Sequence, residues 1–93
     1  MIKTFACKET KKIWNGQRSS KLPGDIQNRA LRKLRQLDAS QTLEDLRNPP
    51  GNRLEILKGD CRGQYSIRIQ QQWRICFTWD KGNANDVEIV DYH

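Results

Sequence analysis

Residues 64–79 read QYSIRIQQQWRICFTW, and this stretch decides the fold. Apolar side chains alternate with polar ones within residues 65–69, and again within residues 73–79. A period of two residues places successive side chains on opposite faces of a strand. The connection between the two runs is short, as in a hairpin. The stretch therefore predicts two adjacent antiparallel strands with one apolar face and one polar face.

The same alternation extends to both sides of this stretch. Leu54 and Ile56 alternate with polar neighbours, and Lys58-Gly59-Asp60 then predicts a turn. A second turn is predicted at residues 80–83, and Val87 and Ile89 follow in a last strand. The C-terminal half of the chain is therefore expected to form an antiparallel meander with short connections.

The period changes to 3.6 residues upstream of the meander. Ile26, Ala30, Leu34 and Leu37 recur at helical spacing, which predicts an amphipathic helix over roughly residues 22–38 that docks one stripe on a core. Shorter elements are expected on both sides of this helix. A short strand and a helical turn are expected within residues 5–14, and a further turn within residues 43–46. Helix formation is expected to stop at residues 49–52.

Helices followed by a meander predict an α+β fold, with N-terminal helices packed on one face of an antiparallel β-sheet. Residue parity then assigns the two faces of that sheet. The side chains expected to meet the helices are Leu54, Ile56, Tyr65, Ile67, Ile69, Trp73, Ile75 and Phe77. The other face is expected to be open and polar, and to carry Glu55, Ser66, Arg68, Gln70, Arg74 and Thr78.

The length of 93 residues predicts a single domain, residues 1–93. The cysteines Cys7, Cys61 and Cys76 are odd in number and widely spaced, so neither a disulfide framework nor a zinc site is expected. No apolar run is long enough for a membrane span, and residues 1–6 do not read as a secretory signal. A cytoplasmic protein without membrane contact is the expectation.

The net charge of +6 is concentrated in the first part of the chain. Residues 1–40 hold ten Lys and Arg against three acidic residues. Such an excess favours a polyanionic partner, although a solvated helix surface would explain the charge equally well.

The last four residues, Val90-Asp91-Tyr92-His93, hold groups suited to RNA chemistry. Cleavage by transesterification needs a base for the 2′-hydroxyl, an acid for the leaving 5′-oxygen and cations for the phosphate, but no metal. Tyr92 has the parity of the polar face, and the unperturbed pKa of histidine suits proton transfer by His93. Either Glu55 or Asp91 could serve as the base or orient the imidazole. The cations that could bind the phosphate are Lys58, Arg68 and Arg74.

These residues resemble a known family. Leu57-Lys58-Gly59-Asp60, Trp73-Arg74-Ile75 and the terminal Asp91-Tyr92-His93 occur in the order and spacing of the HigB toxins of the RelE superfamily. Residues 48–55, NPPGNRLE, resemble the GraT-like subgroup. The resemblance implies a RelE-like microbial RNase fold and the toxin of a type II toxin–antitoxin system.

Such toxins are expected to cut messenger RNA in the decoding site of the 70S ribosome, without metal or cofactor. The implied partner is a HigA-like helix-turn-helix antitoxin, and operator DNA would be bound only through the antitoxin complex. The residues carried over as catalytic are Lys58, Arg74, Asp91, Tyr92 and His93, with Glu55 as a candidate base. The residues expected to contact RNA are Arg68, Arg53, Lys8, Lys11, Lys12, Arg29, Arg32, Lys33 and Arg35.

One departure from the family pattern concerns Glu55, which stands where some members have histidine. An unperturbed glutamate has a pKa near ~4.3 and is therefore ionised at neutral pH, which suggests an altered division of roles or slower cleavage. Two alternatives to the ribonuclease remain. One is a non-catalytic RNA- or ribosome-binding module, and the other is a DNA-binding repressor, although no second helix with a tight turn follows the basic one.

Overall fold

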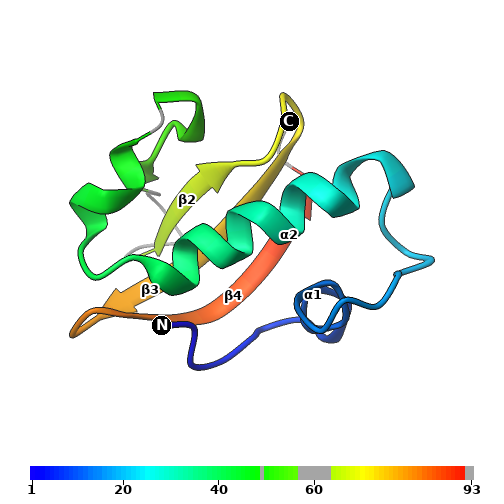
Figure 1. Cartoon of the computed structure of the whole chain (residues 1–93), viewed down its shortest axis with the longest axis horizontal. Helices are drawn as coiled ribbons and strands as arrows, with labels where there is room; N and C mark the ends of the chain where they lie inside the picture. Colours follow the sequence, from blue (N-terminus) through cyan, green and yellow to red (C-terminus); the bar gives the residue numbers. More distant parts are fainter. Residues whose placement is uncertain (49, 57–63, 92–93) are drawn as a thin grey trace.

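The structure, a computed structural model, describes residues 1–48, 50–56 and 64–91. Two helices come first, α1 (Lys8–Trp14) and α2 (Gly24–Ala39), followed by two 3₁₀ turns, η1 (Leu43–Arg47) and η2 (Pro50–Asn52). The strands are β1 (Glu55–Ile56), β2 (Gln64–Arg68), β3 (Trp73–Asp80) and β4 (Asn83–Asp91). They pair antiparallel in the order β1-β2-β3-β4. The predicted α+β fold with helices on one face of an antiparallel sheet is confirmed (Figure 1).

Helix α2 supplies one half of the core. Ile26, Ala30, Leu34 and Leu37 are all fully buried, because their spacing puts them on the face that meets the sheet. They pack with Ile67, Ile75 and Phe77 of β2 and β3 in a single cluster. The helix begins at Gly24, directly after Pro23, and ends at Ala39, so the predicted range of 22–38 was shifted by one or two residues.

The hairpin between β3 and β4 fixes the register of the longest strand pair. Lys81 and Gly82 form the two-residue turn with φ angles of 51° and 82°. Positive φ at both central residues is the signature of a type I′ turn, whose twist matches that of the flanking strands. A Cβ atom on Gly82 would also lie 3.3 Å from the carbonyl oxygen of Gln41, a tight contact, so glycine is favoured there on two grounds.

The chain's first residues cover the outer edge of β4. Ile2 and Phe5 form isolated parallel bridges with Ala84 and Val87. Further along the strand, the backbone N–H of Ile89 donates to the hydroxyl of Thr10 in α1. These contacts occupy polar backbone groups that an edge strand would otherwise present to another chain. The short strand expected near Phe5 is thus a pair of bridges, and the helical turn after it is α1.

Two expectations were wrong in detail. Ile56 was expected to meet the helices, but it is 65% exposed, because β1 is a two-residue strand at the edge of the sheet. Residues 49–52 were expected to stop helix formation outright, but Pro50–Asn52 form a 3₁₀ turn. A proline at the first position of a helical turn needs no N–H donor, so it ends an α-helix without preventing this turn. The predicted turn at Lys58-Gly59-Asp60 lies outside the described residues.

Candidate functional site

The face of the sheet away from α2 carries a row of side chains that crosses all four strands. The register pairs Glu55 with Ser66, Ser66 with Cys76, and Cys76 with Glu88. Directly paired residues of antiparallel strands point to the same face. The next row pairs Arg68 with Arg74 and Arg74 with Val90. Two carboxylates at the sides and an arginine near the centre therefore share one face.

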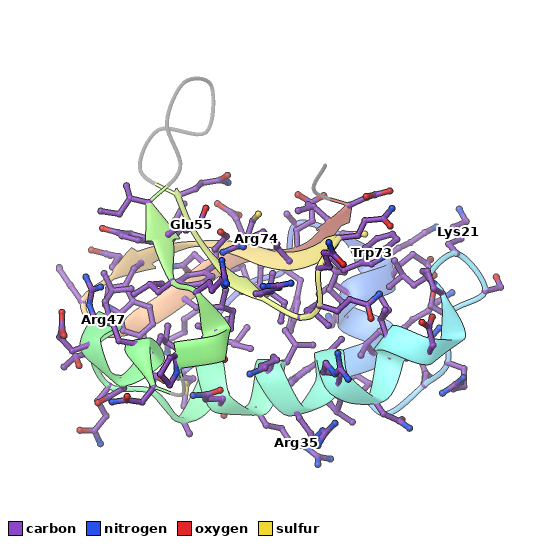
Figure 2. All side chains as sticks on the ribbon, turned by 90° about the horizontal axis from the view of Figure 1, so that it is seen from above. Lys21, Arg35, Arg47, Glu55, Trp73 and Arg74 are labelled. Carbon is purple, nitrogen blue, oxygen red and sulfur yellow. The ribbon has the colours of Figure 1, made fainter. Side chains whose placement is uncertain are left out.

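Arg74 is the centre of this face, and it is buried. Only 5% of the residue is exposed. Its Nε donates to the Ser66 hydroxyl at 2.8 Å, and its Nη2 donates to the Arg53 carbonyl at 2.5 Å. Its Nη1 lies 3.6 Å from the Glu55 carboxylate, which is 46% exposed (Figure 2). Burial of a charge is costly unless hydrogen bonds and an opposite charge compensate it, and here both are present.

The arrangement corrects one expectation. Ser66 and Arg74 lie on the predicted face, but that face is not open at their positions, since Ser66 is fully buried and Arg74 nearly so. Parity determines the face of a side chain and carries no information on what covers it. Here the segment that contains Arg53 and Glu55 lies beside the guanidinium and bonds to it.

The Arg53 carbonyl is held in place by a buried asparagine. Arg53 has a φ of 45°, a left-handed conformation that non-glycine residues rarely adopt. The preceding Asn52 is fully buried, and its Nδ2 donates to the carbonyls of Leu46 at 3.1 Å and Asn48 at 3.3 Å. The Lys33 ammonium of α2 donates to the Asn52 Oδ1. A chain of contacts thus runs from α2 through η2 to Arg74.

Four of the predicted RNA-binding cations lie together at the β2 side of the molecule. They line a cleft of about 550 Å³ between α2 and the turn that joins β2 to β3. Burial, together with the positive charges of Arg32 and Arg29, lowers the pKa of Lys33 below its usual value. The four residues are Arg29, Arg32, Lys33 and Arg68.

The other predicted cations lie elsewhere, so the basic N-terminal surface is divided. Lys8, Lys11 and Lys12 belong to α1, which lies on the β4 side of α2 (Figure 1). The Lys12 ammonium pairs with Glu9 at 3.4 Å. Arg35 points away from the sheet on the outer side of α2 (Figure 2). The side chain of Arg53 is exposed.

Asp91 and Arg74 are not brought together by the register. Asp91 pairs with Trp73, so alternation places it on the opposite face from Arg74, and its Oδ1 accepts a hydrogen bond of 2.9 Å from Gln72. The predicted catalytic residues Lys58, Tyr92 and His93 lie outside the described residues.

Glu88 and the role of Asn52 were missed in the sequence, and the partner of Ser66 was not predicted. Glu88 has the parity of the polar face, and alternation with Val87 and Ile89 could have revealed it. Ser66 was placed on the right face, but its bond to Arg74 depends on the register between β2 and β3. Asn52 gives no signal, because its role depends on Lys33, which is 19 residues away.

Neither a metal-binding cluster nor a membrane helix occurs in the described part of the chain. None of its His, Cys, Asp and Glu side chains forms a group of three that could hold a metal ion. Within the same ranges, no helix is long and apolar enough to cross a membrane.

Solved structures with the same fold include a YoeB–YefM complex from Staphylococcus aureus. A chain of that complex superposes with a TM-score of 0.63 at 22% identity, over 100% of this chain and 95% of the other. At this identity the likeness concerns the fold alone. It supports the arrangement of helices and sheet described above.

Comparisons of sequence identify the family. The Toxin HigB-1 of Vibrio cholerae is 49% identical over 63 residues, which span 68% of this chain and 66% of that protein, slightly under two thirds of its length. The Endoribonuclease HigB of Proteus vulgaris is 32% identical over the full length of both chains. The family model described as "RelE-like toxin of type II toxin-antitoxin system HigB" matches residues 3–93. The chain therefore belongs to the HigB-like family of RelE-like toxins of type II toxin–antitoxin systems.

Proposed function

We propose that this toxin is a ribosome-dependent endoribonuclease that cleaves messenger RNA in the decoding site by metal-independent attack of a 2′-hydroxyl on the adjacent phosphate. The observation that carries the proposal is the pair formed by Arg74 and Glu55 on the polar face. In this pair, a rigidly held cation lies 3.6 Å from a carboxylate that is about half exposed. A cation and a base side by side are what this attack requires.

The reaction moves one proton and exchanges one bond. A base takes the proton of the 2′-hydroxyl, and the 2′-oxygen forms a bond to phosphorus. The bond from phosphorus to the 5′-oxygen then breaks, and an acid protonates that oxygen. The products are a 2′,3′-cyclic phosphate and a free 5′-hydroxyl. Arg74 stabilises the added negative charge on the pentacoordinate phosphate, because its guanidinium is fixed before the substrate arrives.

Glu55 is the proposed base, because its carboxylate reaches solvent beside Arg74. His93 is the proposed acid, with Tyr92 and Lys58 as further contacts to the phosphate. These three assignments rest on the family motif and on residue chemistry. Asp91 receives a lesser role, since its described contact is with Gln72, on the face opposite Arg74.

Two relatives support the enzyme class and the partner. The Proteus vulgaris relative is named an endoribonuclease, and it aligns with the whole of this chain. A type II toxin is paired with an antitoxin by definition of the family. We propose that the antitoxin here is HigA-like, and that the toxin contacts operator DNA only through the complex. A gel shift with the toxin alone and with the complex tests the last point, and binding by the toxin alone would contradict it.

The test of the proposed function maps cleavage on messages bound to purified 70S ribosomes, by primer extension. Wild type is expected to cut within the decoding site, whereas Glu55→Gln and His93→Ala should each slow cleavage by about 10²-fold or more, as for the loss of a general base or acid. The same RNA without ribosomes should stay intact.

Glu44→Gln is the matched control for Glu55→Gln. Glu44 also pairs with an arginine, Arg47, at 2.9 Å, but its side chain is 77% exposed and lies in η1. Cleavage by this control should equal that of wild type. If wild type binds ribosomes but leaves the message uncut, the protein is a non-catalytic ribosome-binding module. If the Glu55→Gln variant cuts at the wild-type rate, another residue is the base.

A further inference from the structure

The cleft beside α2 has an unbalanced charge. Of the described residues that line it, four are cationic and none is acidic. Arg29 and Arg32 are exposed, while Lys33 and Arg68 are half-buried. Burial, and after it the positive charges of Arg32 and Arg29, lowers the pKa of Lys33. Like charges that are held close together repel, so the free cleft is electrostatically unfavourable and an anion would relieve it.

The remaining lining suits a polar polymer better than a compact apolar ligand. Gln36, Gln70 and Gln71 contribute amides that can donate and accept hydrogen bonds, and Gly51 and Ile69 complete the wall. A volume of about 550 Å³ is within the usual range for ligand sites, which lies at roughly 300–1,000 Å³. Arginines bind phosphate through two parallel hydrogen bonds, so two arginines one helical turn apart favour consecutive phosphates.

Two contacts connect residues that line the cleft with the candidate active site. Arg68, which lines the cleft, is the direct partner of Arg74 in the register of β2 and β3. Lys33, on the opposite wall, donates to Asn52, whose neighbour Arg53 accepts the hydrogen bond from Arg74. Arg68 therefore belongs both to the lining of the cleft and to the row of side chains that contains Arg74.

We propose that this cleft binds the sugar–phosphate backbone of single-stranded RNA, and that it holds the substrate strand on one side of the bond to be cut. The inference rests on the proposed function, because it takes Arg74 as the position of the scissile phosphate. The pairing of Arg68, which lines the cleft, with Arg74 favours RNA over an acidic segment of a partner protein. The cleft then supplies binding energy at a distance from the reacting bond, which is one way to position a substrate.

The test measures binding without cleavage. A fluorescein-labelled RNA oligonucleotide with 2′-O-methyl groups cannot react, and its anisotropy reports affinity in the absence of ribosomes. Arg29→Gln/Arg32→Gln should weaken binding, and the slope of log affinity against log salt should become shallower by about 1.4, at about 0.7 for each phosphate that the variant no longer neutralises. Both side chains are exposed, so the variant should keep the wild-type fold.

Lys3→Gln/Lys21→Gln is the control with the same change of net charge. Lys3 lies along the β4 edge, Lys21 lies in the loop before α2, and neither lines the cleft. This control should keep the wild-type affinity and salt slope. If both double variants weaken binding equally, the effect is one of net charge and the proposal fails.

Two further outcomes separate the cleft from the reaction. If Arg29→Gln/Arg32→Gln weakens the complex with the antitoxin but leaves RNA binding unchanged, the cleft is a protein-binding site and the proposal is wrong. If wild type binds the methylated RNA through the cleft but cuts no message on ribosomes, the RNA site stands and the proposed enzymatic function fails. The RNA affinity measured for the cleft therefore does not depend on catalysis.

Discussion

Two charged side chains are buried among the residues that the structure describes, and their surroundings differ. Glu9 in α1 is 7% exposed and accepts a hydrogen bond of 2.5 Å from the Ser19 hydroxyl, with the Lys12 ammonium at 3.4 Å. Its partners come from residues 9–19, a single local segment. Arg74 in β3 is 5% exposed and takes its partners from β1, β2 and the segment before β1.

The difference suggests different roles for the two charges. Glu9 stabilises a local turn, whereas the candidate site is built around Arg74. The environment of Glu9 can form as soon as the loop after α1 closes. The environment of Arg74 exists only when the sheet is complete, and its carboxylate partner lies at a looser 3.6 Å with about half of its side chain in solvent. Neutral hydrogen-bond partners hold Arg74 in place, and its acidic partner is exposed. Its positive charge can therefore attract an incoming phosphate.

The largest expected effect comes from Arg74→Lys. Lysine keeps the charge but cannot donate to the Ser66 hydroxyl and the Arg53 carbonyl in the geometry of a guanidinium. Ribosome-bound cleavage should fall by about 10²–10³-fold, as for loss of a fixed donor to the transition state. Single-turnover kinetics measures it, and Arg47→Lys in the exposed pair with Glu44 is the control. Wild-type cleavage by the lysine variant would refute a role for the guanidinium fork.

Asn52→Ala should have the next largest effect, and on two observables. It removes the amide that bonds to the Leu46 and Asn48 carbonyls and to the Lys33 ammonium. Loss of partners for such buried groups should lower the free energy of unfolding by about 1–3 kcal/mol. Cleavage should also fall, since the strained Arg53 carbonyl would no longer be fixed beside Arg74.

Urea unfolding and single-turnover kinetics measure the two effects of Asn52→Ala. Thr4→Ala is the control, because the Thr4 hydroxyl also accepts a hydrogen bond from a backbone group, the Asp86 N–H, but at an exposed position on the β4 edge away from the cleft. A variant that loses stability but keeps the wild-type rate at low temperature would show that Asn52 is structural only.

The fold could be predicted because local patterns determine it. The two-residue period of residues 65–69 and 73–79 and the 3.6-residue period of Ile26 to Leu37 each depend on neighbours in sequence. The predictions were wrong where tertiary contacts determine whether a residue is buried. Ile56 has the parity of a core residue, yet it lies at the sheet edge, where its strand has only two residues. Periodicity indicates on which face of an element a side chain lies, but not whether other residues bury that face.

The candidate site was less predictable, for a related reason. Glu55 was named from its chemistry and Arg74 also from the family motif, and the structure brings them together. Their connection depends on the Arg53 carbonyl, a backbone group in a rare conformation that no side-chain pattern encodes. Arg68 was assigned to the same face as Arg74, and their pairing confirms it, but its place in the lining of the cleft beside α2 was not predicted.

Glu9→Gln tests the other member of the comparison, through the pH dependence of stability. The Ser19 hydroxyl, followed by the positive charge of Lys12, holds the pKa of Glu9 below its usual value of 4.5. A carboxylate whose pKa is lowered by folding stabilises the protein above the unfolded-state pKa, and this contribution is lost as the pH falls through the folded-state value. Wild type should therefore exceed Glu9→Gln in stability at pH 7, and the gap should close below pH 4.5.

Urea unfolding at a series of pH values measures the gap. Cleavage at pH 7 should be the same for Glu9→Gln and wild type, provided that both are folded. A constant gap at all pH values would mean that the hydrogen-bond geometry of Glu9 matters and its ionisation does not.

The smallest effects are expected from the two serines that bond to these charges. Ser19→Ala and Ser66→Ala each remove one hydroxyl partner of a charged side chain. Both should lower the free energy of unfolding, but by less than Asn52→Ala, because the Asn52 side chain bonds to three groups. Their consequences should then diverge. Ser19→Ala should raise the pKa of Glu9 toward its usual value, since the Ser19 hydrogen bond is the largest cause of its lowering, and cleavage should not change.

Ser66→Ala should slow cleavage by more than its loss of stability explains, because Arg74 keeps its bond to the Arg53 carbonyl but no longer has the Nε hydrogen bond that fixes its plane. The pair of variants is measured by urea unfolding and single-turnover cleavage at one temperature. Equal losses of cleavage rate in the two variants would contradict the proposed difference between Glu9, a local structural charge, and Arg74, a charge of the candidate site. Both serines are buried and both are hydrogen-bonded to an ion, so slower cleavage by Ser66→Ala alone would point to the role of Arg74 in the reaction.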